Sequence, residues 1–250
     1  MQLNNKTIII TGASSGIGET AAVLFATQGA NLVLGARREA LLKQLAAKIT
    51  DSGGSAVFLA GDVRTEAYAD GLVQLATAEF GGLDGAFNNA GVMGDTVPIP
   101  DMERANWNDV IATNLTSAFF AAKYQIPALK LRRRGSILFT SSFVGYANGG
   151  IPGMGAYAAS KAGLIGLAQS LSAQHGTDGI RVNTLLPGGT RTAMAGDDPE
   201  IHDYIAGLHP LGRMADPEEI AEAALFLLSD RASFVTGSAM TVDGGISIRL

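Results

Sequence analysis

Short runs of apolar and β-branched residues alternate along the chain with longer segments of helical pattern. The runs are apolar at nearly every position, which is typical of strands in a parallel sheet that is covered on both faces. Alternation of such strands with helices predicts an α/β fold with a doubly wound sheet. The expected strands lie at 6–11, 31–36, 56–61, 84–89, 135–142, 180–187 and 238–244, and the main helical segments at 16–28, 38–51, 66–80, 104–133 and 156–174.

We expect a single domain over residues 1–250, because no linker, repeat or low-complexity tract divides the chain. With 47% hydrophobic and 16% charged residues, the chain can bury a large core, and its few charges suggest that further surface is buried between subunits. The net charge of −5 argues against a nucleic-acid partner. The basic stretch LRRRG at 131–135 is interpreted as a solvated helix end.

Cysteine is absent from the sequence, which excludes disulfides and thiolate metal sites and is compatible with a cytoplasmic protein. The N-terminal apolar run is too short for a signal peptide, and no stretch approaches the roughly 18 apolar residues of a transmembrane helix. We therefore expect a cytoplasmic protein that does not associate with a membrane.

A glycine-rich turn, TGASSGIGET, follows the first predicted strand and opens the first helix. Glycines at 12, 16 and 18 would let a pyrophosphate approach the helix N-terminus, where free N–H groups and the helix dipole attract an anion. The spacing is G-x-x-x-G-x-G, which differs from the standard dinucleotide pattern. The alternative is an ordinary turn, since Gly and Ser are common there, but the position favours nucleotide binding.

The end of the second predicted strand bears on which dinucleotide is bound. Ala36 stands where a carboxylate would bind the ribose 2′-hydroxyl of NAD, and Arg37 and Arg38 follow it. An arginine can instead pair with a 2′-phosphate. The alternative is that both merely begin the next helix, although cations are not favoured at a helix N-terminus. We expect NADP(H), with Arg37 the stronger candidate and NAD(H) as the alternative.

Five motifs in order resemble the short-chain dehydrogenase/reductase family: TGASSGIG, NNAG at 88–91, TSS at 140–142, YAASK at 157–161 and PGGTRTAM at 187–194. The similarity continues through VTGSAMTVDGG near the C-terminus. It implies a Rossmann-like sheet of seven parallel strands with helices on both faces. It also implies hydride transfer between NAD(P) and an alcohol or carbonyl compound.

Tyr157 and Lys161 are four positions apart, so in a helix they share one face. A free tyrosine has a pKa near 10, and a neighbouring ammonium would lower it. By resemblance Tyr157 is the general acid or base, and Lys161 lowers its pKa and binds the nicotinamide ribose. The resemblance further implies that Ser142 binds the substrate oxygen, with Ser141 as a weaker alternative, and that Asn114 helps to hold a proton-relay water.

The same resemblance implies a longer set of cofactor contacts. Asp62 would flank the adenine together with Val63, although an aspartate at a strand end can also be a simple turn residue. The expected cofactor-binding residues are Gly12, Ser14, Ser15, Gly16, Ile17, Gly18, Arg37, Arg38, Asp62, Val63, Asn89, Ala90, Gly91, Tyr157, Lys161, Pro187, Gly188, Thr190 and Thr192.

Substrate choice would depend on the loops 91–100, 142–155 and 192–212, because ligands bind beyond the carboxyl ends of the strands. The segment 190–212 is long enough to act as a lid. No lysine or arginine in these loops is placed to bind a charged substrate, which favours an uncharged alcohol or ketone. The three histidines lack metal-ligand spacing, so we expect no metal. Candidate apolar wall residues are Met93, Val144, Tyr146, Met154, Met194, Tyr204 and Leu208.

The predicted function is NADP(H)-dependent reduction of a ketone or oxidation of a secondary alcohol. The alternatives are a 3-oxoacyl-[acyl-carrier-protein] reductase, which would need a basic patch for its acidic carrier, and an NAD-dependent sugar or polyol dehydrogenase. A non-catalytic dinucleotide sensor is less compatible with the presence of Tyr157, Lys161 and Ser142. The family resemblance implies a homotetramer, with interfaces on 104–133, 156–174 and the C-terminal segment.

Overall fold

A computed structural model describes residues 1–147 and 151–249. Seven parallel strands form one sheet in the order β3-β2-β1-β4-β5-β6-β7. The predicted seven-stranded doubly wound sheet is therefore confirmed. The strands are β1 (Thr7–Thr11), β2 (Asn31–Ala36), β3 (Ser55–Ala60), β4 (Gly85–Asn88), β5 (Gly135–Thr140), β6 (Ile180–Pro187) and β7 (Ala239–Val242).

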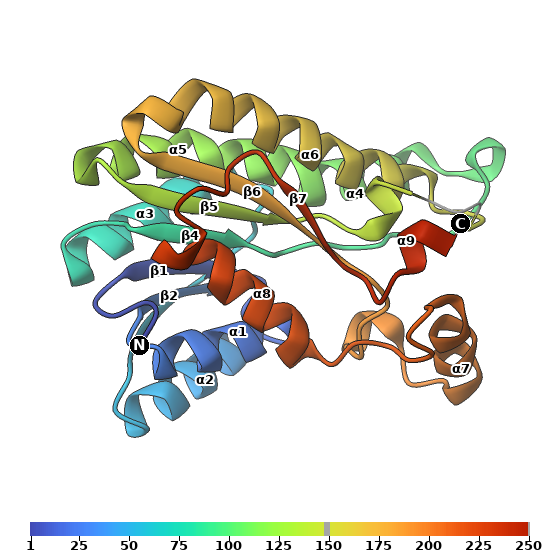
Figure 1. The fold of residues 1–250 in the computed structure, drawn as a ribbon, viewed down its shortest axis with the longest axis horizontal. Coiled ribbons are helices and arrows are strands. Elements are labelled where there is room, and N and C mark those ends of the chain that lie inside the picture. The colour runs from blue at the N-terminus through green and yellow to red at the C-terminus, as the bar shows by residue number, and fades with distance from the viewer. Residues whose placement is uncertain (148–150, 250) are drawn as a thin grey trace.

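Helices cover both faces of the sheet (Figure 1). One face packs against α1, α2 and α8, and the other against α3, α5 and α6. The helices are α1 (Gly16–Thr27), α2 (Glu39–Asp51), α3 (Glu66–Phe80), α4 (Arg104–Ile111), α5 (Ser117–Arg132), α6 (Gly155–His175), α7 (Pro199–Leu208), α8 (Pro217–Leu228) and α9 (Ile246–Arg249).

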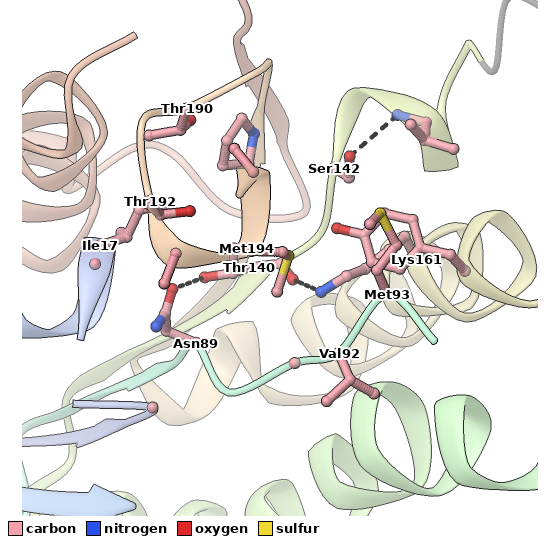
Figure 2. A pocket seen from close by; sticks show the side chains of 18 of the residues that line it. Ile17, Asn89, Val92, Met93, Thr140, Ser142, Lys161, Thr190, Thr192 and Met194 are labelled. Atoms are coloured by element: carbon pink, nitrogen blue, oxygen red, sulfur yellow. Dashed lines mark hydrogen bonds between the residues drawn. The ribbon is translucent and has the colours of Figure 1, made fainter. Parts of the chain in front are cut away.

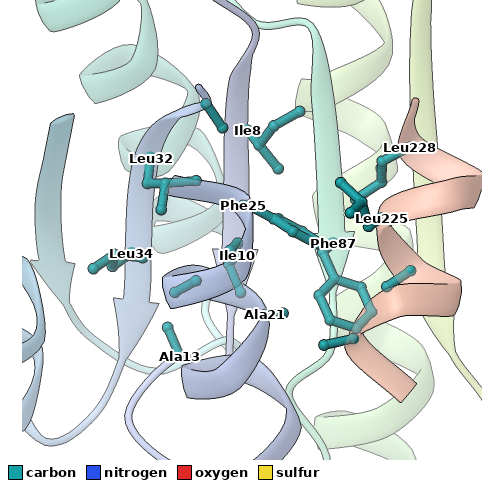
Figure 3. Close-up of a cluster of buried hydrophobic side chains, with 14 of the residues drawn as sticks. Ile8, Ile10, Ala13, Ala21, Phe25, Leu32, Leu34, Phe87, Leu225 and Leu228 are labelled. Atoms are coloured by element: carbon teal, nitrogen blue, oxygen red, sulfur yellow. The ribbon is translucent and has the colours of Figure 1, made fainter. Parts of the chain in front are cut away.

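The two faces explain why the strands are apolar at every position. Ile8 and Ile10 point toward α1 and α8, whereas Ile9 between them joins the core on the opposite face. Figure 3 shows the first of these cores, where Phe25 of α1 lies against Phe87 of β4 with ring centroids 6.2 Å apart. Both faces of β1 are buried, so its middle three positions are all apolar.

The sheet changes winding direction at β1, which has β2 on one side and β4 on the other. The turns that follow β1 and β4 therefore lie next to each other at the carboxyl edge. The Asn89 N–H donates to Thr11 Oγ1 at 3.1 Å and joins the two turns. Such a switch point leaves a crevice in which open α/β sheets bind ligands.

The predicted helical segment over 104–133 is confirmed in its extent, because helical residues run without a break from Arg104 to Arg132. A π-helical turn over Ala112–Thr116, which the sequence does not reveal, divides it into α4 and α5. Pro127 is accommodated inside α5. The basic stretch at 131–135 lies at the exposed C-terminal end of α5, where cations are electrostatically favoured, so its interpretation as a solvated helix end is confirmed.

Candidate active site

A cavity of about 800 Å³ opens at the carboxyl edge of the sheet. Its wall is built by the turns after β1 to β6, by α6, by the segment around α7 and by the start of α9. Figure 2 shows how side chains from these separate segments converge on it. Of the site residues predicted from the sequence, all line the cavity except Gly18 and Asn114, which are buried and contact residues of its wall.

The glycine-rich turn needs glycine for two physical reasons. Gly12 and Gly16 have φ values of 68° and 58°, which side chains disfavour. A Cβ on Gly18 would lie 2.3 Å from the carbonyl oxygen of Gly12. The side chain of Ser15, the residue before α1, does not cap the helix. The first N–H groups of α1 therefore remain available as hydrogen-bond donors beside the cavity. Such an end fits a pyrophosphate.

Two guanidinium groups lie at the end of β2, where α2 begins. Arg38 Nη2 donates to Ser14 Oγ at 2.8 Å and to Ser15 Oγ at 2.6 Å, across the glycine-rich turn. Arg37 also lines the cavity. Within residues 1–147 and 151–249, neither arginine has a carboxylate within salt-bridge distance. The sequence ranks Arg37 above Arg38, whereas the contacts with the turn belong to Arg38.

Asp62 follows β3 and is both a wall residue and a turn residue. Its carboxylate accepts from the Arg64 backbone N–H at 2.9 Å and pairs with the Arg64 guanidinium at 2.6 Å. This hydrogen bonding lowers the pKa of Asp62. Arg64 also lines the cavity, and its guanidinium pairs with Asp109 of α4, so it connects Asp62 to that helix.

Tyr157 and Lys161 face the cavity from one side of α6, as the helical spacing predicts. The Lys161 ammonium lies 5.5 Å from the centroid of the Tyr157 ring. Lys161 is 3% exposed, and its Nζ donates to the Thr140 carbonyl at 2.7 Å (Figure 2). Burial of the ammonium lowers the pKa of Lys161 to about 8.

The expected lowering of the Tyr157 pKa is wrong for the chain by itself. Burial raises the pKa of Tyr157, because a phenolate loses hydration there, and hydrogen bonding to Ser142 acts in the opposite direction. The Lys161 ammonium is directed to the Thr140 carbonyl, not to the phenol oxygen. In this arrangement the tyrosine is a proton donor.

The two candidate serines are distinguished by their hydrogen bonds. Ser141 Oγ donates to the Lys161 carbonyl at 2.7 Å, so its proton is used to hold α6. Ser142 Oγ accepts from the Val144 N–H at 3.3 Å, and its hydroxyl lies beside the Tyr157 phenol instead of holding α6. Ser142 therefore has the geometry expected for binding a substrate oxygen.

Asn114 lies in the π-helical turn and connects three segments. Its Oδ1 accepts from the Val92 N–H at 2.8 Å, and its Nδ2 donates to the Val92 carbonyl at 2.8 Å and to Ser160 Oγ at 3.0 Å. Both amide protons are therefore used inside the protein, which leaves only one lone pair of Oδ1 for a relay water. The side chain holds the loop after β4 to the helix that carries Tyr157.

The turns after β4 and β6 complete the polar half of the cavity. Asn89 Oδ1 accepts from Thr140 Oγ1 at 3.1 Å, which fixes the amide (Figure 2). Thr190 Oγ1 donates to the Gly188 carbonyl at 3.0 Å. Thr192 meets the glycine-rich turn, because a Cβ on Gly16 would lie 3.0 Å from its methyl carbon.

The other half of the cavity is apolar. Of the seven predicted wall residues, six line it, but Tyr146 does not and is 67% exposed. Residues 148–150 of the predicted substrate loop lie outside the described residues. Sequence reasoning missed further wall residues, among them Ile151, His209 and Ile246. No motif or periodicity indicates them, because they come from loops or chain ends brought together only by the fold.

In the part of the chain that the structure describes, no group of three His, Asp or Glu side chains could hold a metal ion. Nor does this part contain a helix long and apolar enough to cross a membrane.

The chain is similar to known proteins over nearly its whole length. Residues 12–247 match the family model described as enoyl-(acyl carrier protein) reductase. The chain is 39% identical to a 2,5-dichloro-2,5-cyclohexadiene-1,4-diol dehydrogenase of Sphingobium indicum, with 98% of each chain covered. It is 40% identical to a 3-oxoacyl-[acyl-carrier-protein] reductase of Chlamydia muridarum, again over 98% of each. A solved short-chain type dehydrogenase/reductase from Mycobacterium marinum superimposes with a TM-score of 0.94 at 32% identity, over 98% of this chain and 97% of the other.

Proposed function

Because the chain belongs to the short-chain dehydrogenase/reductase family, we propose that it interconverts an uncharged, largely apolar ketone and its secondary alcohol with NADP(H). It is an oxidoreductase that acts on hydroxyl or carbonyl groups, as its relatives do. The observation that carries the finer proposal is the division of one cavity into a polar and an apolar half, with Tyr157 and Ser142 among the residues of its wall.

The polar half fits a nicotinamide dinucleotide. The uncapped N-terminus of α1 and the space kept by the three glycines would hold the pyrophosphate. Arg37 and Arg38 would hold a 2′-phosphate, and this anion would offset the cost of two cations at the start of α2. When bound, the dinucleotide supplies or accepts the hydride. The remaining contacts would come from Asp62, Val63, Asn89, Ala90, Gly91, Pro187, Gly188, Thr190 and Thr192.

The chain's own residues move the proton. In the reduction direction the Tyr157 hydroxyl donates its proton to the carbonyl oxygen of the substrate, while the Ser142 hydroxyl donates a hydrogen bond to that oxygen. Lys161 supplies a positive charge as the phenolate forms. Asn114 supports the arrangement by holding the loop after β4 to α6.

The apolar half favours a substrate of low polarity. Met93, Met194 and Leu208 contribute to its wall, and such a wall would leave the hydroxyls of a sugar or polyol unpaired. The Sphingobium relative is named for a six-membered ring diol, which makes cyclic ketones suitable probes. The carrier-protein reductase is the second candidate, favoured by the Chlamydia relative.

We further propose a homotetramer that is located in the cytoplasm. Support for the assembly comes from α5, where the apolar Phe119 is 52% exposed and its ring lies tilted beside that of Phe120. Light scattering of the purified protein would test it, and a monomeric mass would contradict it.

The coenzyme and substrate are tested together by steady-state kinetics. NADPH and NADH are each combined with cyclohexanone derivatives, open-chain ketones and β-ketoacyl thioesters, and absorbance of the reduced nicotinamide is followed. We expect turnover with NADPH and cyclic ketones. A preference for NADH would contradict the assignment of the arginines, and turnover only with acyl thioesters would favour the second candidate.

A further inference from the structure

His209 ends α7 and borders the cavity, yet the proposed chemistry does not use it. Its imidazole is 3% exposed. Nε2 accepts from the Gly189 N–H at 3.0 Å, and Nδ1 lies 2.7 Å from the Ile205 carbonyl. Because a backbone N–H can only donate and a carbonyl can only accept, the ring must be neutral with its proton on Nδ1. Both nitrogens are thus committed to the backbone of two different segments.

Glycines surround the ring. A Cβ on Gly188 would lie 2.7 Å from Nε2, and one on Gly189 would lie 2.9 Å from Cε1. Neither glycine has a positive φ, so the backbone conformation of the turn does not require them. Gly244, from the segment after β7, faces the opposite edge, with a Cβ placed 3.2 Å from Cδ2. The imidazole therefore packs directly against the backbone of the turn, where a side chain on Gly188 would also meet Asp243 and one on Gly189 would also meet Ile205.

The ring connects two parts of the cavity that have different ligands. Gly189 belongs to the turn after β6 that also carries Thr190 and Thr192, whereas Ile205 and Leu208 of α7 belong to the apolar wall. We propose that His209 is a positioning residue that holds the coenzyme-facing turn in register with the substrate-facing helix. This inference rests on the proposed function, because that function places the coenzyme against the turn.

Other bonds keep the fold intact without the imidazole. The Gly189 carbonyl accepts from the Ala215 N–H at 2.9 Å, and Arg249 Nη1 donates to the Gly207 carbonyl at 2.6 Å. The turn and α7 therefore remain attached to the rest of the protein when His209 is replaced. Replacement of His209 removes only the direct connection between the turn and α7. We therefore expect it to weaken coenzyme binding more than it lowers the stability of the fold.

The test compares His209→Leu and His209→Gln in the full chain. Leucine removes the acceptor, whereas the glutamine amide offers an acceptor for the Gly189 N–H and a donor for the Ile205 carbonyl. Hydrogen exchange of the Gly189 amide is measured by NMR without coenzyme, and the KM for NADPH and kcat are measured separately. We expect His209→Leu to speed exchange and raise KM by roughly fivefold to tenfold with a smaller change in kcat, and glutamine to restore both in part.

A matched control keeps the test decisive. His202→Leu changes a histidine of the same helix whose Nε2 lies 2.8 Å from the Gly196 carbonyl, and it should leave exchange and KM unchanged.

Wild-type exchange in His209→Leu would overturn the proposal, and so would fast exchange with an unchanged KM for NADPH. The proposed function fails by a different result, namely full turnover by a Tyr157→Phe variant. The exchange measurement does not depend on turnover, so the two failures are distinguishable.

Discussion

The two halves of the cavity are built by different means. The polar half, which we propose binds the coenzyme and call the coenzyme half, consists of backbone and small residues at the ends of central strands. Gly12, Gly16 and Gly18 keep side chains away from it. The apolar half, which we propose binds the substrate and call the substrate half, consists of apolar side chains from loops, α7 and the C-terminal α9. A change in the first half should therefore act through the backbone and affect every reaction. A change in the apolar side chains of the second should alter substrate choice and leave coenzyme binding alone, whereas His209 connects the two.

The largest effect is expected in the glycine-rich turn. Gly18→Ala places a methyl group 2.3 Å from the Gly12 carbonyl oxygen and forces the turn to move. We expect coenzyme affinity to fall by about 100-fold or more, because misplacement by about 1 Å has effects of this size. Titration calorimetry with NADPH measures it. Gly176→Ala, where nothing lies within 4 Å of the new methyl group, is the matched control. Equal affinity in the two variants would contradict a backbone-built site.

Lys161 lies where the two halves of the cavity meet, and its protonation should make ketone reduction depend on pH. Burial lowers its pKa to about 8, so the ammonium is present below that pH and is lost above it. Ketone reduction should therefore decline above about pH 8, by about tenfold per unit if the charge is essential. Lys161→Arg should move the decline to higher pH, because a guanidinium stays charged. The profile of kcat/KM from pH 6 to 10 measures this, with the exposed Lys43→Arg as control. A flat profile in the wild type would contradict the role of Lys161.

Coenzyme choice should change when the two arginines at the end of β2 are removed. Arg37→Ala combined with Arg38→Ala deletes the charge-assisted bonds proposed for a 2′-phosphate. We expect the KM for NADPH to rise by about tenfold to 100-fold, while the KM for NADH changes little. The ratio of the two values is the measurement. The single variants Arg37→Ala and Arg38→Ala show which arginine contributes more to this ratio. Because Arg38 contacts Ser14 and Ser15, we expect the larger change in the ratio from Arg38→Ala. An unchanged ratio in the double variant would remove the basis for NADP(H).

The smallest effect is expected in the apolar wall. Leu208→Ala removes contact area from the substrate half without reaching the coenzyme half. We expect the KM for a cyclic ketone to rise by roughly threefold to tenfold with an unchanged affinity for NADPH. Leu211→Ala, at a position that is 68% exposed, is the control. A parallel loss of NADPH affinity in Leu208→Ala would show that the halves are not separable.

The strands and the polar half of the cavity could be predicted from the sequence, whereas much of the apolar half could not. The central strands are recognisable because both of their faces are buried, as Ile8, Ile9 and Ile10 show. The polar half is recognisable because a tight turn against a phosphate requires glycines at fixed spacing. Helix α8 could also have been predicted, since Asp216 and Glu219 form a capping box at its start.

The remaining features depend on tertiary contacts. The π-helical turn that carries Asn114 has no breaker in its sequence, so the segment is interpreted as a continuous helix. Ile246 comes from α9 and reaches the wall only because the chain returns after β7. The raised pKa of Tyr157 follows from burial, which spacing alone does not reveal.

We propose above that Tyr157 donates the proton to the substrate oxygen between the two halves of the cavity. This proposal is tested most directly by comparing wild type with Tyr157→Phe for both NADPH binding and reduction of a cyclic ketone that the wild type turns over. We predict an unchanged dissociation constant for NADPH and a kcat lower by about 10²- to 10⁴-fold, because the ring remains and only the proton donor is lost. A phenylalanine variant with a kcat close to that of the wild type would contradict the account.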